Sequence, residues 1–249
     1  MSAARATAPV RTDWPRRVEP ELLDELSADD PRALRSRKDL QRVNGLMGSA
    51  SILLRALDRA GDIKPPRLLV ELGAGDGSVM LRMARARRKR WAGARLILID
   101  RQPCITAETL AEFRDLGLQP EVLAIDVFDW LALPEETPVD IVIVNLFLHH
   151  FNSGALEQLM HGISRRTRAF VCCEPRRSRL ALVGSHLLGA IGCNEVTRHD
   201  AVLSVHAGFR DHELTTLWPQ PATLENAWSI RESAAGMFSH LFVASRSEA

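Results

Sequence analysis

The stretch LLVELGAGDGS, residues 68–78, decides the fold of this chain. A short apolar run predicts a buried strand. It is followed by three alternating glycines and by a helical pattern that starts at Val79. Glycines allow positive φ angles and let a ligand approach the backbone closely. The stretch therefore predicts a strand, a tight turn and a helix, the first half of a βαβ unit that binds a nucleotide-like ligand.

The charges of this loop indicate which ligand it accepts. The glycines are spaced G-x-G-x-G, with Glu71 before them, Asp76 among them, and no Lys or Arg. A dinucleotide fingerprint has the spacing G-x-G-x-x-G and holds a pyrophosphate at a helix start. Two carboxylates would repel a pyrophosphate but attract a ligand with ammonium and sulfonium groups. A P-loop is excluded as well, because no Gly-Lys-Ser/Thr follows.

Residues 71–77 resemble motif I of the class I S-adenosylmethionine (SAM)-dependent methyltransferases. The resemblance covers about residues 67–244, and it continues with acids after two further predicted strands, 94–100 and 121–125. It implies an α/β fold: a Rossmann-like, seven-stranded, mostly parallel sheet with helices on both faces and a C-terminal antiparallel hairpin. In this chain, N-terminal helices precede the sheet. The implied cofactor is SAM, with S-adenosylhomocysteine (SAH) as its product.

Acids at strand ends are the main cofactor-binding candidates. Asp100 closes the second predicted strand, where a carboxylate can accept hydrogen bonds from ribose hydroxyls, although it could also cap the following helix. The resemblance places Asp126 against the adenine amino group and the N–H of Val127 on a ring nitrogen, with Asp129 as a nearby competitor. The expected cofactor-binding set is Glu71, Gly73, Ala74, Gly75, Gly77, Asp100, Arg101, Asp126, Val127 and Asn145.

Catalytic candidates follow the fourth predicted strand, 139–145, which continues as LFLHHF. This segment lacks an Asn-Pro-Pro-Tyr type of motif and resembles that of small-molecule O-methyltransferases. A phenol titrates near 10, so a histidine base would assist methyl transfer at neutral pH. The resemblance to phenolic O-methyltransferases puts this base at His149 and a carboxylate at Glu174. That family tends to have Asp where this chain has His150. The base could instead be His150, or His199 beside Asp200, or the His-His pair could be purely structural.

The resulting prediction is a SAM-dependent methyltransferase that modifies a small organic acceptor, at a phenolic or polyketide-like hydroxyl of secondary metabolism. Two alternatives stay open: C- or N-methylation of a small molecule, and a SAM-binding module without turnover. The sequence shows no set of carboxylates and amides typical of a divalent-metal site, so no metal is expected.

The chain divides into three predicted regions. Residues 1–18, rich in Ala, Arg and Pro, predict a flexible arm, and residues 19–66 predict helices that cap the cofactor and wall the acceptor pocket, or merely cover an edge of the sheet. Residues 67–249 form the predicted methyltransferase domain. Its insertion at about 176–218 is the least regular part, and it is either a lid over the acceptor or an ordinary crossover.

Composition limits the partners. A net charge of +1 and a pI near 7.8 create no global field for nucleic acid, and the basic run at 85–90 is typical of a solvated helix end. No apolar stretch is long enough to span a bilayer.

The four cysteines lack metal-ligand spacing, and adjacent Cys172 and Cys173 should face opposite sides of a strand. We therefore expect reduced thiols in a cytoplasmic protein without a signal peptide, and a homodimer stays open.

Overall fold

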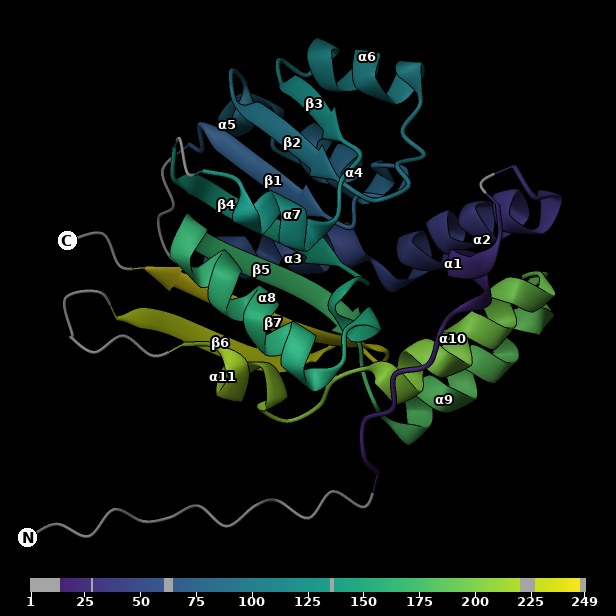
Figure 1. The fold of residues 1–249 in the computed structure, drawn as a ribbon. Helices are drawn as coiled ribbons and strands as arrows, with labels where there is room; N and C mark the ends of the chain where they lie inside the picture. The colour runs from purple at the N-terminus through teal and green to yellow at the C-terminus, as the bar shows by residue number, and fades with distance from the viewer. Residues whose placement is uncertain (1–13, 28, 61–64, 135–136, 220–226, 247–249) are drawn as a thin grey trace, which may run out of the picture.

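A computed structural model describes residues 14–27, 29–60, 65–134, 137–219 and 227–246. Its centre is a seven-stranded sheet in the order β3-β2-β1-β4-β5-β7-β6 (Figure 1). The first five strands are parallel, and β7 runs antiparallel to both β5 and β6. The bounds are β1 Leu68–Leu72, β2 Arg95–Ile99, β3 Gln119–Leu123, β4 Val139–Asn145, β5 Thr167–Pro175, β6 Trp228–Ala235 and β7 Ser239–Arg246. The predicted fold class is confirmed.

The third strand is shifted from its predicted position. It begins at Gln119 and ends at Leu123, two residues earlier than the predicted range 121–125. It includes Pro120, which cannot donate a ladder hydrogen bond. Proline is tolerated here because β3 is the edge strand of the sheet.

Helices cover both faces of the sheet and enclose one apolar core on each side. The first core is formed with α3, α4 and α6, and the second with α7, α8 and α11, which lie in front of the sheet in Figure 1. As predicted, the adjacent cysteines point to opposite faces: Cys173 belongs to the first core and Cys172 to the second. The bounds are α3 Ser49–Arg59, α4 Ser78–Ala86, α5 Arg88–Trp91, α6 Ala107–Asp115, α7 Val127–Ala132, α8 Ser153–Arg166 and α11 Glu213–Leu217.

The remaining helices form a separate layer beyond the carboxyl ends of the parallel strands, at the right of Figure 1. In this layer α10 packs against α1, α2 and α9. The insertion at 176–218 is therefore regular and helical, because Ser178 and Asn194 cap its helices by accepting the N–H groups of Ala181 and Thr197. The bounds are α1 Leu22–Glu25, α2 Pro31–Met47, α9 Arg179–His186, the 3₁₀ helix η2 Leu187–Ile191 and α10 Glu195–Ala207.

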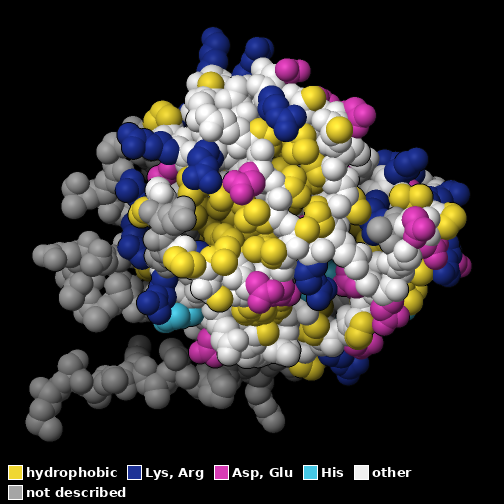
Figure 2. All heavy atoms as spheres, turned by 45° about the horizontal axis from the view of Figure 1, so that its top comes forward, with side chains coloured by type: hydrophobic (Ala, Val, Ile, Leu, Met, Phe, Trp, Pro, Cys, Tyr) yellow, Lys and Arg dark blue, Asp and Glu magenta, His cyan; other side chains and the backbone are white. Residues whose placement is uncertain are grey.

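The basic run lies at the ends of α4 and α5, where two of its arginines have acidic partners. Arg87 pairs with Asp58 and Arg85 pairs with Glu112, and all of these side chains are partly or largely exposed. On the face shown in Figure 2, hydrophobic side chains gather in the centre while Lys and Arg stand mostly toward the margins, near acidic residues. In the part of the chain that the structure describes, no helix is long and apolar enough to cross a lipid bilayer.

Candidate active site

A cavity of about 560 Å³ lies between the strand ends and the outer helical layer. Several residues predicted for the site line it: Glu71, Gly73, Ala74, Gly75, Asp100, Arg101, Asn145 and His149. Among the described residues, five other predicted members are not part of this lining: Gly77, Asp126, Val127, His150 and Glu174. The structure thus brings most of the predicted cofactor set to one end of a single cavity, together with one of the two adjacent histidines.

The glycine loop needs its glycines for two different reasons. Gly73 and Gly75 have φ angles of 67° and 54°, in the left-handed region that disfavours side chains. A Cβ atom on Gly73 would also lie 2.4 Å from the ring of Phe147. A Cβ atom on Gly75, in contrast, would meet nothing within 4 Å, and its N–H donates to Oδ2 of Asp100 over 2.8 Å. Gly73 therefore allows close packing of the loop on the chain after β4, while Gly75 leaves open space above the loop.

Two buried acceptor atoms in this end of the cavity have no hydrogen-bond partner in the described structure: Oε2 of Glu71 and Oδ1 of Asn145. Buried acceptors are normally satisfied, so an orphaned pair that faces a cavity suggests a missing donor. Burial raises the pKa of Glu71 well above its usual value, and the negative charges of Asp76 and Asp100 raise it further. A cationic donor such as the ammonium group of SAM fits this pair of acceptors.

The two predicted strand-end acids have different surroundings. Asp100 lines the cavity, and its two carboxylate oxygens accept the N–H groups of Gly75 and Gln102. Each oxygen can accept a further hydrogen bond, so a ribose remains compatible with this position. Asp126 is the N-cap of α7 and accepts the N–H of Phe128 over 2.8 Å. The predicted adenine contacts of Asp126 and Val127 stay predictions.

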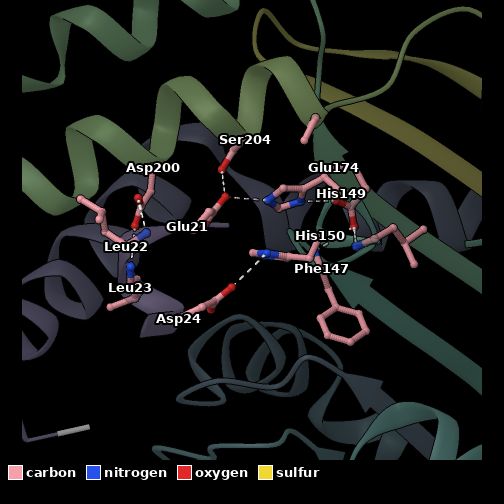
Figure 3. Close-up of polar contacts among 12 residues, drawn as sticks. Glu21, Leu22, Leu23, Asp24, Phe147, His149, His150, Glu174, Asp200 and Ser204 are labelled. Carbon is pink, nitrogen blue, oxygen red and sulfur yellow. Dashed lines mark hydrogen bonds and ion pairs between the residues drawn. The ribbon is translucent and has the colours of Figure 1, made fainter. Parts of the chain in front are cut away.

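His149 and Glu174 form the buried centre of the site (Figure 3). Nδ1 of His149 lies 2.8 Å from Oε2 of Glu174, while Oε1 accepts the N–H groups of Phe147 and Leu148. The chain bends sharply just after β4. The bend is possible because Leu146 adopts a φ of 53°, which is unusual for a bulky residue. The bend after β4 and the end of β5 therefore fix the imidazole ring and leave Nε2 as its second reactive atom.

Glu21 occupies the Nε2 side of His149, and nothing in the sequence pattern marked this residue. Its Oε1 lies 3.3 Å from Nε2 and also accepts the hydroxyl of Ser204 (Figure 3). Burial alone would lower the pKa of His149, but its hydrogen bonds with Glu174 and Glu21 outweigh burial and raise the pKa to about 9. Burial alone would raise the pKa of Glu21, but His149 lowers it to about 2. At neutral pH the described state is an imidazolium between two carboxylates.

Glu21 is held by the segment that contains it, residues 14–25, which we call the N-terminal strap. Asp200 of α10 accepts the N–H groups of Leu22 and Leu23 at 2.9 Å each. The guanidinium of Arg16 donates to the carbonyls of His149 and Phe151, at 2.9 and 2.8 Å. The predicted flexible arm, 1–18, lies outside the described residues up to position 13. Its last residues, in contrast, connect the bend after β4 to the insertion.

The other two histidine candidates lie differently. His150 has Nδ1 3.3 Å from Oδ2 of Asp24, and its ring centroid is 4.3 Å from that of His149. His199 pairs with Asp200 at 3.0 Å, as the sequence suggested, but its side chain is about half exposed and does not line the cavity.

A metal-ligand arrangement that the sequence did not reveal lies beside the base candidates. Glu21, His149 and His150 could together hold a metal ion, since their ligand atoms lie within 4.8 Å of one another. The group includes a residue of the N-terminal strap, which is why spacing along the chain gave no sign of it. The expected absence of a metal therefore stays a prediction.

Comparisons with known proteins agree with this geometry. Residues 69–169 match the sequence profile of a family described as "Methyltransferase domain", whereas no curated protein matches the sequence. The plantazolicin methyltransferase BpumL, solved in complex with SAH, superposes with a TM-score of 0.57 at 11% identity, over 88% of this chain and 92% of that chain.

Two O-methyltransferase structures are similar in fold. An O-methyltransferase family protein from Burkholderia thailandensis has a TM-score of 0.55 at 16% identity, over 88% of this chain and 61% of that chain. The mitomycin 7-O-methyltransferase MmcR has a TM-score of 0.55 at 17% identity, over 90% of this chain and 60% of that chain. The chain thus spans about three fifths of these two proteins but nearly the whole of BpumL.

Proposed function

We propose that this chain is a class I SAM-dependent methyltransferase that methylates a hydroxyl group of a small organic acceptor, of phenolic or polyketide-like type. One observation carries the proposal. A histidine that is oriented by a buried carboxylate lies at the wall of the same cavity that contains most of the residues predicted to bind the cofactor. Such a pair is suited to remove a proton from an acceptor hydroxyl.

The cofactor-binding end of the cavity offers contacts for the ammonium and ribose groups of SAM. Glu71 and Asn145 would hold the ammonium group, Asp100 the ribose, and the loop from Gly73 to Gly77 would lie against the cofactor. When bound, SAM supplies a methyl group on a sulfonium sulfur, so the protein does not need to activate the electrophile. The remaining tasks of the protein are to orient the acceptor and to take its proton.

His149 takes this proton at Nε2. In the described state Glu21 occupies Nε2, so the acceptor hydroxyl must first replace the Glu21 carboxylate there. With one carboxylate withdrawn, His149 loses a contact that raised its pKa and releases its proton to solvent. The acceptor O–H then donates to neutral Nε2. Nε2 would take the proton as the hydroxyl is methylated, a transfer that breaks the S–CH3 bond of SAM and leaves SAH, while Glu174 would hold Nδ1 and stabilise the imidazolium.

The raised pKa of His149 has one favourable and one unfavourable consequence for proton transfer from the acceptor. Glu174, which stays at Nδ1 when the acceptor replaces Glu21, raises the pKa of His149 and so strengthens it as a base toward a phenol, which titrates near 10. The cost is that the free protein holds His149 mostly protonated at neutral pH. The kcat/KM for a phenol should therefore rise with pH up to about 9.

A matched acceptor panel tests the proposed reaction. The protein is incubated with SAM labelled at its methyl group and with a phenol, an aniline and an anisole that share the same ring substituents. We expect label on the phenol oxygen only, because the proposed site binds and deprotonates a hydroxyl group, which the aniline and the anisole lack. Label on the aniline nitrogen with none on the phenol would contradict O-methylation and favour the alternative N-methylation. Cofactor binding without transfer to any acceptor would contradict turnover.

A further inference from the structure

The end of the cavity at the outer helices is walled mostly by aliphatic side chains. Leu40, Val43 and Met47 of α2 face it from one side, and Leu188 of η2 faces it from another. Polar side chains of α2 line the cavity as well, but Gln41 contacts Asp76 of the glycine loop and Asn44 contacts Asn145, so they belong to the cofactor end. The polar group beside the aliphatic wall that the proposed reaction uses is His149. A ligand that fits this end must therefore combine a polar group at His149 with an apolar body along α2 and η2.

The apolar wall continues to the surface of the protein. Leu46, Leu187 and Ile191 line the cavity, yet they are exposed by 75%, 61% and 41%. Large aliphatic side chains that are both lining and exposed form an apolar rim. Contiguous exposed apolar surface of this kind commonly marks a binding site. Because the rim is continuous with the cavity, its natural occupant is the outer part of the molecule whose inner part reaches His149.

Helix α9 leaves room for such a molecule. Its face toward the cavity carries small residues, Ala181, Gly184 and Ser185, which are spaced as neighbours on one helix face. A larger residue at position 184 would require the side chain of Phe238 to move, because a Cβ atom built on Gly184 would lie 2.7 Å from the Phe238 ring. The outer face of the same helix carries Leu180 and Val183, which are exposed and are not part of the lining.

We propose that the acceptor is amphipathic: its hydroxyl-bearing head reaches His149, and an apolar tail follows α2 and η2 to the rim formed by Leu46, Leu187 and Ile191. This inference rests on the proposed function for the identity of the head but not for the existence of the tail. Each buried methylene of the tail strengthens binding by up to about fourfold. The gain ends where the tail passes the rim into water.

A series of 4-alkylphenols with tails of zero to ten carbons tests the inference. Binding to the SAH-loaded protein is measured by calorimetry below the micelle concentration of each phenol. We expect affinity to rise about two- to fourfold per carbon and then level off. Leu187→Ser should lower the affinity for long tails by about tenfold and leave phenol itself unaffected. Since Leu187 is largely exposed, this substitution should not disturb folding.

The matched control is Leu180→Ser, which changes an exposed leucine of the adjacent α9 that does not line the cavity. It should leave the whole series unchanged. An affinity independent of tail length would overturn the inference, and so would equal losses in Leu180→Ser and Leu187→Ser, which would place the tails on the outer surface. Binding is measured without turnover, so a tail-length series without methyl transfer would support the tail while contradicting the proposed function.

Discussion

The two ends of the cavity are built in different ways. The cofactor end comes from one strand–turn–helix unit and from residues that close neighbouring strands, so its parts are fixed by local sequence and by the parallel sheet. The acceptor end joins the N-terminal strap, α2 and the insertion, which are far apart in the chain and meet through α10. Substitutions at the first end should therefore change SAM binding, whereas those at the second should change proton transfer and acceptor binding.

The largest expected effect is the loss of turnover when His149 is replaced, because this change should affect proton transfer at the acceptor end without affecting SAM binding at the cofactor end. His149→Ala should lower kcat on a phenol by about 10²–10⁴-fold, the usual contribution of a general base, while the Kd of SAM stays nearly the same. The matched control is His199→Ala, because His199 also pairs with a carboxylate but does not line the cavity. Steady-state kinetics and calorimetry give both quantities. Nearly full turnover in His149→Ala would place the base elsewhere, with His150 next to test.

The next prediction compares two acids of the cofactor end. Asp100→Ala should weaken SAM binding by about 1.5–3 kcal/mol, the usual worth of a hydrogen bond to a charged group. Asp126→Ala is the informative partner, because Asp126 caps α7 and is not part of the cavity lining. It should cost about 1 kcal/mol of stability through the lost cap and change SAM affinity less than Asp100→Ala does. Equal losses of affinity would restore Asp126 to its predicted place at the adenine.

The contrast also shows what the sequence could predict. The glycine loop was readable from period and charge, whereas the seven strands and the places of His149 and Glu174 followed from the family resemblance that this loop carries. Glu21 was not readable, since its place at Nε2 depends on how Asp200 and Arg16 hold the strap. The insertion looked irregular because its apolar residues divide between the cavity and the second core, although Ser178 and Asn194 already marked helix starts.

Loosening the N-terminal strap should have a moderate effect that is confined to the acceptor end of the cavity. Asp200→Ala leaves the N–H groups of Leu22 and Leu23 without their acceptor, which costs about 1–3 kcal/mol and raises the open fraction of α1 about 5- to 150-fold. Amide exchange in α1 should accelerate accordingly, while amides of α8 serve as the internal control.

Ligands should act on the same segments in the opposite direction. Binding of SAH and an acceptor to the unaltered protein should slow exchange in residues 176–210 and in the described N-terminal helices. Exchange that is the same with and without ligands would make these segments a fixed wall rather than a lid.

The smallest expected effect is the release of a proton at the cofactor end when SAM binds. Burial and the nearby acids raise the pKa of Glu71, so this carboxyl holds a proton more readily than an ordinary glutamate, whereas the ammonium group of SAM favours its ionised form. SAM binding should therefore release up to one proton, and affinity should rise with pH. Calorimetry at about pH 6.5, where the α-amino group of SAM is already charged, in two buffers of different ionisation enthalpy measures this release. Glu71→Gln should abolish it; release that persists in this variant would assign the proton to another group.

The central claim is that His149 is the base and that Glu21 holds Nε2 until the acceptor arrives. It is tested most directly by the pH dependence of kcat/KM for a phenol, which reports the free enzyme. In the unaltered protein the lower limb should titrate near 9. In Glu21→Gln it should move down toward the usual histidine value of about 6.5 without reaching it, because Glu174 still holds Nδ1. A limb at the same pH in both proteins would contradict the account.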